Sequence, residues 1–165
     1  MIDILELERR QAAALIVKHL ACQAGIDVVP AGVGRFLTYV YHYTGFKFEQ
    51  IGHGRHHDVF DIVSPHGGRL GIVLKLGNRP SIQAELKFVA EFPQDWAKVY
   101  DSFDFGLVCE KIALVGSDDG LTKDPEFRQR LAELADRYSS VTLDDIGLIG
   151  DRVVITGSSQ RVKRT

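Results

Sequence analysis

The chain has 165 residues and a mass of 18.4 kDa, the size of one ordinary domain or of one domain with a short accessory segment. Its 45% of hydrophobic and 25% of charged residues are typical of a soluble globular protein and exclude a disordered chain. A formal net charge of -2 gives no overall basic field for nucleic acid, and no apolar run reaches the roughly 18 residues that cross a bilayer.

The N-terminal part of the chain predicts two helices. Residues 3–24 carry apolar side chains at helical intervals, and Gly25 is a plausible stop. These apolar positions are Leu5, Ala12, Ile16 and Leu20. Residues 33–43 predict a second helix that Gly45 would end, although the run from Thr38 to Tyr41 would also suit a strand.

After Gly45 the pattern changes to strands. Three segments, residues 46–49, 59–63 and 70–76, predict an antiparallel meander in which Gly52 and Gly54 break the first strand and residues 64–68 form a turn. Pro80 opens a helix that ends near Pro93. Two more strands follow, over about 97–102 and 106–112.

The C-terminal part predicts a polar loop, a helix and a hairpin. The loop covers residues 117–123, and Asp124-Pro125-Glu126 then starts a helix over 124–138 with a capping side chain and a proline in the first turn. Residues 146–149 and 153–156 form the hairpin around Gly150-Asp151. The last eight residues, 158–165, form a polar tail with basic side chains, and such ends are commonly disordered.

Together these elements predict an α+β fold. We expect a five-stranded antiparallel sheet with a packed helix, preceded by N-terminal helices and followed by a reduced C-terminal helix plus hairpin. The expected organisation is one compact domain with a helical segment over 1–45, a core over 46–157 and a basic tail over 158–165.

The segment between the first two strands carries the most chemical information. Gly52 and Gly54 would let backbone N–H groups approach phosphate oxygens. Lys75, on the neighbouring strand, offers a positive charge to those phosphates, and Glu85 on the next helix could hold it in place. The strand and loop around Glu110 and Ile112 would leave free backbone groups for a purine edge.

This pattern resembles the small lobe of the protein-kinase-like fold over roughly residues 46–115, with a further match over 126–157. Gly52, Gly54 and Val59 match the family's glycine-rich loop, while His57 replaces its third glycine. Lys75 falls at the position of the strand lysine, and Glu85 is the candidate for its helix partner, at a shorter interval than in most protein kinases. The resemblance implies a nucleotide site for ATP with magnesium. Its residues would be Gly52, Gly54, Val59, Lys75, Glu85, Glu110 and Ile112.

The catalytic part of the family pattern is incomplete. Asp145 stands where the family has its catalytic-loop asparagine, and Thr156, followed by Gly157, stands at the metal-binding aspartate. The catalytic aspartate would fall at Ser140, which cannot accept a substrate proton at neutral pH. The resemblance therefore implies no catalytic residue, with Asp144 and Asp145 as nonstandard candidate metal ligands.

These departures indicate a non-catalytic or weakly active kinase-like module that acts through contacts with an unknown protein partner. Such reduced forms look like proteins carried by phages and mobile elements. The N-terminal helix would either pack on the sheet or mediate self-association. One alternative is an ATP-dependent phosphotransferase or other nucleotide-binding enzyme that uses Asp144 and Asp145 with a metal. A second is a small α+β module that binds nucleic acid through its His/Arg loop and its tail residues Arg161, Lys163 and Arg164.

A few further residues allow narrower expectations. The four residues His53, His56, His57 and Asp58 suggest a metal site, but adjacent histidines in an extended segment point to opposite faces, so exposed loop histidines are the simpler interpretation. Cys109 is expected in the core and Trp96 as a core or interface anchor. Cys22 and Cys109 lack the spacing of a disulfide scaffold, which fits a reducing cytoplasm.

Overall fold

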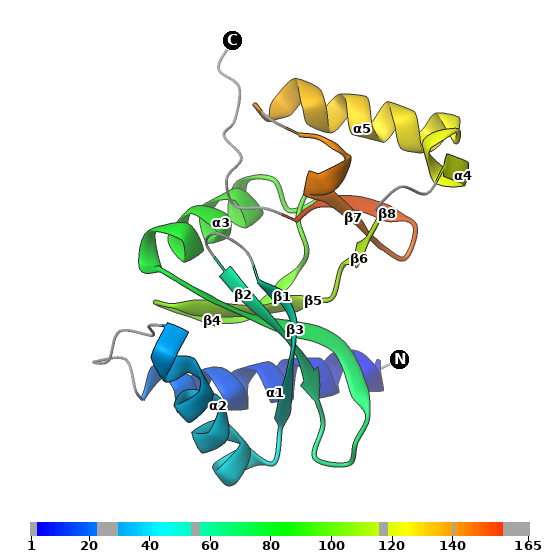
Figure 1. Ribbon diagram of the computed structural model, residues 1–165. Coiled ribbons are helices and arrows are strands. Elements are labelled where there is room, and N and C mark those ends of the chain that lie inside the picture. The colour runs from blue at the N-terminus through cyan, green and yellow to red at the C-terminus, as the bar shows by residue number, and fades with distance from the viewer. Residues whose placement is uncertain (1–2, 23–29, 54–56, 116–118, 140, 157–165) are drawn as a thin grey trace. The chain divides into compact units, whose positions relative to one another are not determined.

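The computed structural model describes residues 3–22, 30–53, 57–115, 119–139 and 141–156 (Figure 1). It is a mixed α+β structure, which confirms the predicted fold class. By its internal contacts the chain divides into two compact units. The first unit contains Met1–Leu86 and Lys98–Lys111, and the second contains Lys87–Ala97 and Ile112–Thr165. This division follows contacts rather than the composition boundaries at residues 45 and 157, and it joins the N-terminal helices to the sheet.

The first unit is built on a five-stranded antiparallel sheet in the order β1-β2-β3-β5-β4. Its strands are β1 (Lys47–His53), β2 (His57–Val63), β3 (Arg69–Gly77), β4 (Val99–Phe103) and β5 (Gly106–Glu110). The predicted meander of the first three strands is confirmed. The prediction that Gly52 breaks the first strand is wrong, because β1 absorbs the glycine through a register shift between Gln50 and Gly52 and continues.

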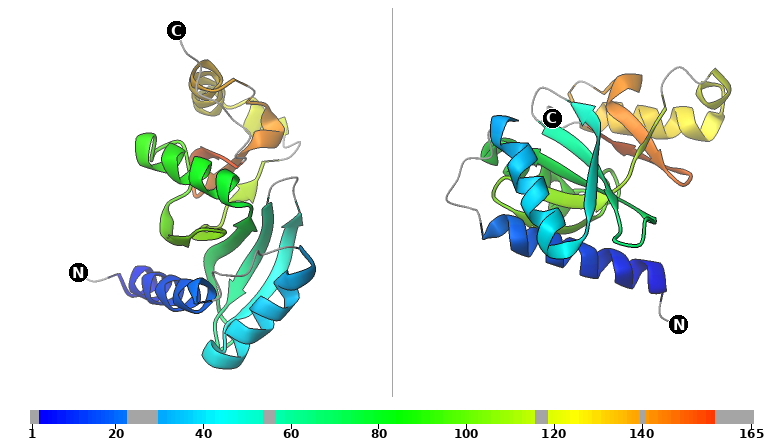
Figure 2. Two further views of the ribbon diagram at one scale, coloured as in Figure 1. Left: turned by 90° about the vertical axis from the view of Figure 1, so that its left-hand side faces the viewer. Right: turned by 60° about the horizontal axis from the view of Figure 1, so that its bottom comes forward.

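Two N-terminal helices, α1 (Ile4–Ala21) and α2 (Pro30–Thr44), lie next to this sheet (Figure 2). Alternate residues of β3 point to the same face. Four of them join the buried residues of α1 and α2 in one apolar core: Leu70, Ile72, Leu74 and Leu76. The helix expected over 33–43 is confirmed and its strand alternative is wrong, because the buried side chain of Val40 gives the segment a core-facing helical side.

The helix α3 (Arg79–Glu91) connects β3 to β4. Asn78 precedes it and accepts a hydrogen bond from the backbone N–H of Ser81 at 2.9 Å, and Pro80 occupies the first turn as the sequence predicts. Ile82 and Glu85 are its buried residues. A carboxylate on the inner face of a helix needs a partner, and this partner defines the candidate site below.

The described part of the second unit contains the end of α3, a three-stranded antiparallel sheet and three further helical segments. The strands are β6 (Ala113–Leu114), β7 (Ile146–Ile149) and β8 (Arg152–Ile155), and the helices are α4 (Asp119–Thr122), α5 (Pro125–Arg137) and the 3-10 turn η1 (Leu143–Asp145). The hairpin of β7 and β8 and the cap of α5 by Asp124 are confirmed. The prediction of an unbroken polar loop over 117–123 is wrong, because the short α4 forms there, and β6 was not expected.

The approach of β6 to β7 requires Gly147. A Cβ atom there would lie 2.1 Å from Ile112 Cγ2 and 2.8 Å from the carbonyl oxygen of Ala113. Because both distances are far below van der Waals contact, any side chain at this position would separate the two strands.

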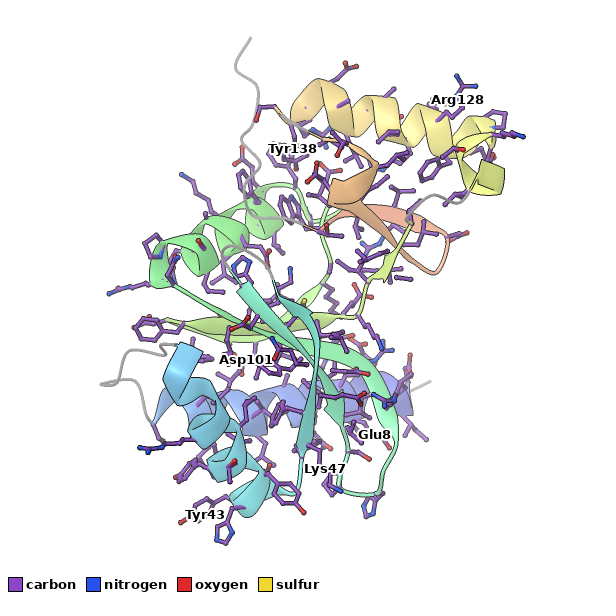
Figure 3. All side chains as sticks on the ribbon, in the orientation of Figure 1. Glu8, Tyr43, Lys47, Asp101, Arg128 and Tyr138 are labelled. Atoms are coloured by element: carbon purple, nitrogen blue, oxygen red, sulfur yellow. The ribbon has the colours of Figure 1, made fainter. Side chains whose placement is uncertain are left out.

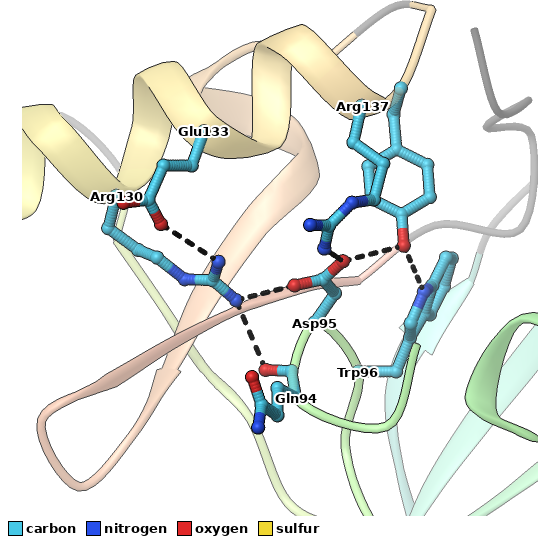
Figure 4. Close-up of polar contacts among 7 residues, drawn as sticks. Gln94, Asp95, Trp96, Arg130, Glu133 and Arg137 are labelled. Atoms are coloured by element: carbon cyan, nitrogen blue, oxygen red, sulfur yellow. Dashed lines mark hydrogen bonds and ion pairs between the residues drawn. The ribbon is translucent and has the colours of Figure 1, made fainter. Parts of the chain in front are cut away.

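Asp95 holds the second unit together (Figure 4). Its carboxylate is 1% exposed and accepts hydrogen bonds from Arg130 at 2.6 Å, from Tyr138 at 2.9 Å and from Arg137. The Tyr138 hydroxyl in turn accepts from Trp96 Nε1 at 3.1 Å. Trp96 is 1% exposed, which confirms it as a core residue.

Candidate functional site

The centre of the candidate site is a buried ion pair between Lys75 and Glu85. Lys75 Nζ lies 3.0 Å from Glu85 Oε1, and the two side chains are 8% and 3% exposed. Lys75 belongs to β3, the middle strand of the first sheet, and points away from the face that α1 and α2 cover, because Leu74 and Leu76 on either side of it point into their core. Glu85 reaches it from α3. The pairing expected from sequence is thus present.

Burial acts in opposite directions on the pKa values of Lys75 and Cys109, two titratable groups on this face. Burial by itself lowers the pKa of Lys75, but the adjacent Glu85 carboxylate outweighs that effect and leaves the pKa above its ordinary value. The ammonium group is therefore charged at neutral pH. Burial raises the pKa of Cys109, on β5, to about 12, so this thiol stays neutral and packs as a small apolar group. The expectation of a core cysteine is confirmed.

The sheet register places three of the sequence-selected residues in one row. Gly52 on β1 is opposite Val59 on β2, and Val59 is opposite Lys75 on β3. A Cβ atom at Gly52 would meet the Val59 side chain at 3.4 Å, an ordinary contact. Gly52, Val59, Lys75 and Glu85 therefore gather in one region, whereas Gly54 lies outside the described residues.

Two backbone N–H groups in the strand expected to meet a purine edge already have acceptors. The N–H of Glu110 donates to the carbonyl oxygen of Lys98 at 3.0 Å, and the N–H of Lys111 donates to that of Gly71 at 2.9 Å. These two N–H groups are therefore not available to a purine edge, while the wider expectation of free backbone groups over residues 105–112 stays a prediction. Ile112 belongs to the second unit, where its side chain faces Gly147.

The proposed metal ligands lie at η1 in the second unit. The Asp145 carboxylate accepts hydrogen bonds from the backbone N–H of Thr142 at 2.9 Å and from its hydroxyl at 3.0 Å. This local role is that of a capping residue. The side chain of Asp144 lies outside the described part, as do Ser140 and Gly157. Within the described part of the chain, no three or more His, Cys, Asp or Glu side chains gather as a metal site would require.

The histidine segment after β1 is described only in part. His57 and Asp58 belong to β2, while His56, Arg55 and the side chain of His53 lie outside the described residues. The basic tail over 158–165 also lies outside them. The metal site and the nucleic-acid contact considered for these segments stay predictions.

Sequence reasoning missed a second charged cluster in the first unit. Asp61 is 1% exposed, and its Oδ2 lies 2.5 Å from Arg69 Nη1 and 3.0 Å from Lys111 Nζ. Asp61 is two residues from Val59 on β2 and so points to the same face as Lys75. An acid within an otherwise apolar strand was the available signal. Both bases contact Oδ2 and bridge the strands, whereas the buried Oδ1 has no hydrogen-bond partner among the described residues.

A groove formed by α2 and β1 contains fewer ionisable side chains than the region around Lys75. Leu37, Thr38, Tyr41, Lys47 and Phe48 line it. Among these described lining residues, Lys47 carries the only formal charge, and its ammonium group lies 5.8 Å from the centre of the Tyr41 ring. None of these five residues is a buried acid or base that could transfer a proton.

No protein-family model matches this chain, and no curated protein is similar enough to count as a relative. Among the described helices, none combines the length and apolar character needed to span a bilayer.

Proposed function

We propose that this chain is a reduced kinase-like protein that acts as a binding or regulatory module through protein contacts and does not transfer phosphate. The observation that carries the proposal is the buried pair of Lys75 and Glu85, which lie 3.0 Å apart. A buried ion pair is a weak source of stability, because removing two charges from water costs about as much as their attraction returns. A pair at the centre of the sheet is therefore a candidate remnant of a binding site.

The elements that present the pair support this proposal. In protein kinases the phosphate-binding lysine stands on the third strand and pairs with a glutamate on the following helix. Here Lys75 lies on β3, and Glu85 lies on α3, which leads to β4. The sheet register also supports the proposal, because it brings Gly52 and Val59 beside Lys75.

The residues available for catalysis support a module without phosphate transfer. Thr156 occupies the place that the resemblance gives to a metal-binding aspartate, and a neutral hydroxyl is a poor ligand for magnesium. The Asp145 carboxylate is engaged with Thr142. We also propose a cytoplasmic location, consistent with the free thiols of Cys22 and Cys109, and a phage or mobile-element origin.

The first test is calorimetric titration with ATP, with and without magnesium, alongside assays of ATP hydrolysis and autophosphorylation. We expect no turnover by the wild-type protein. Phosphate transfer that disappears in Lys75→Met would overturn the proposal, and its loss in Asp144→Asn with Asp145→Asn would favour the enzyme alternative. Saturable ATP binding that is lost when both Lys75 and Glu85 are replaced by methionine would assign a nucleotide to the Lys75 face.

Two variants make this titration interpretable. Lys75→Met alone leaves Glu85 buried without its partner, so Lys75→Met with Glu85→Met removes the lysine without an orphaned charge. Lys87→Met is the matched control, because it removes an exposed lysine from the helix that carries Glu85. ATP binding that is weakened equally by Lys87→Met would point to nonspecific attraction rather than to a site at Lys75.

A further inference from the structure

The first helix has two apolar faces, and the fold uses only one of them. Its inner residues are buried in the core of the first unit: Ala12, Ala13, Ile16, Val17 and Leu20. On the opposite side, Ile4 is 71%, Leu7 45% and Leu15 39% exposed. We call this side the outer stripe of α1, formed by Ile4, Leu7, Glu8, Gln11, Leu15 and Lys18. These positions recur at intervals of three and four and so share one helix face.

Polar contacts at the N-terminal half of α1 fix which face is turned outward. Glu6 accepts hydrogen bonds from the Tyr100 hydroxyl at 2.7 Å and from Lys98, both on or next to β4. Arg9 Nε donates to the carbonyl oxygen of Leu70 on β3 at 2.6 Å. Because these contacts and the apolar core hold the inner face on the sheet, the outer stripe stays exposed in the folded protein.

The charges of the outer stripe are complementary to each other. Glu8, labelled in Figure 3, lies near one end of α1, and Lys18 lies ten residues later, about 15 Å along the helix axis. Neither forms an ion pair with any residue in the described part of the chain. A ligand that satisfies both must present a base near Glu8 and an acid near Lys18.

We propose that the outer stripe binds the outer stripe of a second copy of this chain, with the two α1 helices antiparallel and a two-fold axis at Gln11. Leu7 of one copy then packs against Leu15 of the other, and the two Gln11 side chains face each other. Side chains on a helix lean toward its N-terminus. In the antiparallel pair, Glu8 and Lys18 of the second copy therefore lean toward each other, twice by symmetry.

A second copy fits this surface better than other partners. A polyanion or an anionic membrane requires an excess of basic residues, whereas the outer stripe carries one acid and one base. The helix has 18 residues, and one face of it is small beside the ordinary interface of about 1,600 Å². The dimer is therefore weak and forms only at raised protein concentration.

Sedimentation equilibrium over micromolar to millimolar concentration tests the proposal. We expect the mass to rise from 18.4 kDa toward twice that value as concentration increases. Leu15→Glu should abolish the rise, whereas Leu114→Glu, at a leucine that is 74% exposed on β6, should leave it unchanged. A monomer at all concentrations, or a dimer that Leu15→Glu does not affect, would overturn the proposal.

Charge reversal tests the antiparallel arrangement directly. Glu8→Lys and Lys18→Glu should each weaken dimerisation by about tenfold, because each replaces two attractions by two repulsions, and the double variant should restore it. A double variant that dimerises as weakly as either single variant would refute the pairing.

A cysteine cross-link tests the position of the two-fold axis. The variant Gln11→Cys with Cys22→Ser should form a disulfide-linked dimer on oxidation, and failure to do so in a dimeric sample would refute the axis at Gln11.

Discussion

Two sites in this protein, the Lys75–Glu85 pair and the Asp95 cluster, bury charge in different ways. In the first unit, Lys75 and Glu85 form one ion pair in the middle of a sheet, with the neutral thiol of Cys109 on the neighbouring strand. In the second unit, Asp95 is surrounded by donors: two arginines and the hydroxyl of Tyr138, which Trp96 holds from its other side. Lys75 thus has one carboxylate partner, whereas Asp95 accepts hydrogen bonds from three side chains.

This difference distinguishes a structural cluster, at Asp95, from a candidate functional site, at Lys75. The Asp95 cluster connects the segment after α3 to α5 and leaves neither carboxylate oxygen without a donor, which is what a structural acid requires. Lys75 has three N–H donors, and Glu85 accepts one of them. A buried charge with spare hydrogen-bonding capacity is costly as architecture, so its presence favours a binding role for the Lys75 face.

Breaking the first pair should give the largest effect. Lys75→Met leaves Glu85 buried without its partner, and we expect a loss of about 3–5 kcal/mol in the free energy of unfolding. Lys75→Met with Glu85→Met should recover most of this loss, because neither charge is then buried. Urea unfolding followed by circular dichroism measures both. If the double variant is no more stable than Lys75→Met, the cost lies in lost packing rather than in an orphaned charge.

Breaking the second cluster should cost less per substitution, because its bases are partly exposed. Asp95→Asn retains the shape of the side chain but removes the charge that Arg130 and Arg137 neutralise, and we expect a loss of about 2–3 kcal/mol. Trp96 is the only tryptophan, so its fluorescence reports the second unit during unfolding. Glu133→Gln is a control, since that acid is more than half exposed beside Arg130. Equal losses for the two variants would contradict a central role for Asp95.

The same cluster predicts a dependence on pH. Burial raises the pKa of Asp95, but hydrogen bonds from Arg130, Arg137 and Tyr138 outweigh it and hold the pKa below its ordinary value. A lowered pKa in the folded state means that the stabilisation is complete above about pH 4, the value for an unfolded aspartate, and is lost as pH falls through the lower folded value. Wild type should therefore lose more stability in acid than Asp95→Asn does. Parallel acid titrations of the two proteins would contradict this assignment.

The contrast between these two sites also shows which side-chain contacts the sequence could predict. Lys75 and Glu85 are ten residues apart on a strand and the next helix, so local patterns and the order of the chain suffice to pair them. Arg130 and Arg137 follow Asp95 by 35 and 42 residues, and no local pattern indicates that they meet it. The location of such a cluster depends on tertiary packing.

The sequence analysis did not predict the shortest elements, for a related reason. The strand β6 has two residues and α4 has four, too few for a periodic pattern, and a helix of that length is not stable by itself. The first meander, α2 and α5 were predictable because each carries a repeated apolar pattern. The occupied N–H groups of Glu110 and Lys111 could not be predicted, since sequence does not show how far a strand continues to pair.

A smaller effect should follow from Gly71→Ala on β3. Gly71 has a φ angle of +71°, and a Cβ atom there would lie 2.6 Å from the Arg9 guanidinium. A left-handed conformation costs an alanine about 1–2 kcal/mol, to which the displacement of Arg9 from the Leu70 carbonyl adds. Gly68→Ala is the control, since its nearest contact is an ordinary 3.6 Å to Ser64. If thermal melting shows equal stability for both variants, Arg9 does not hold α1 on the sheet.

The smallest effect should come from Tyr100→Phe, which removes one hydrogen bond to Glu6. Burial, with the Glu6 carboxylate beside it, raises the pKa of Tyr100 to about 12, so the hydroxyl remains a donor at neutral pH. We expect a loss of about 1 kcal/mol, because Glu6 keeps its contact with Lys98. Tyr43→Phe, at a ring that is 61% exposed, should change the melting temperature less.

Comparing the amide hydrogen exchange of these two variants locates the loss. Faster exchange in α1 and β4 of Tyr100→Phe, with the second unit unchanged, is the expected pattern, because Glu6 and Tyr100 both belong to the first unit. Faster exchange around Trp96 as well would show that the units unfold together. The stability of the Asp95 cluster, which belongs to the second unit, would then depend on the packing of α1 against the sheet of the first unit.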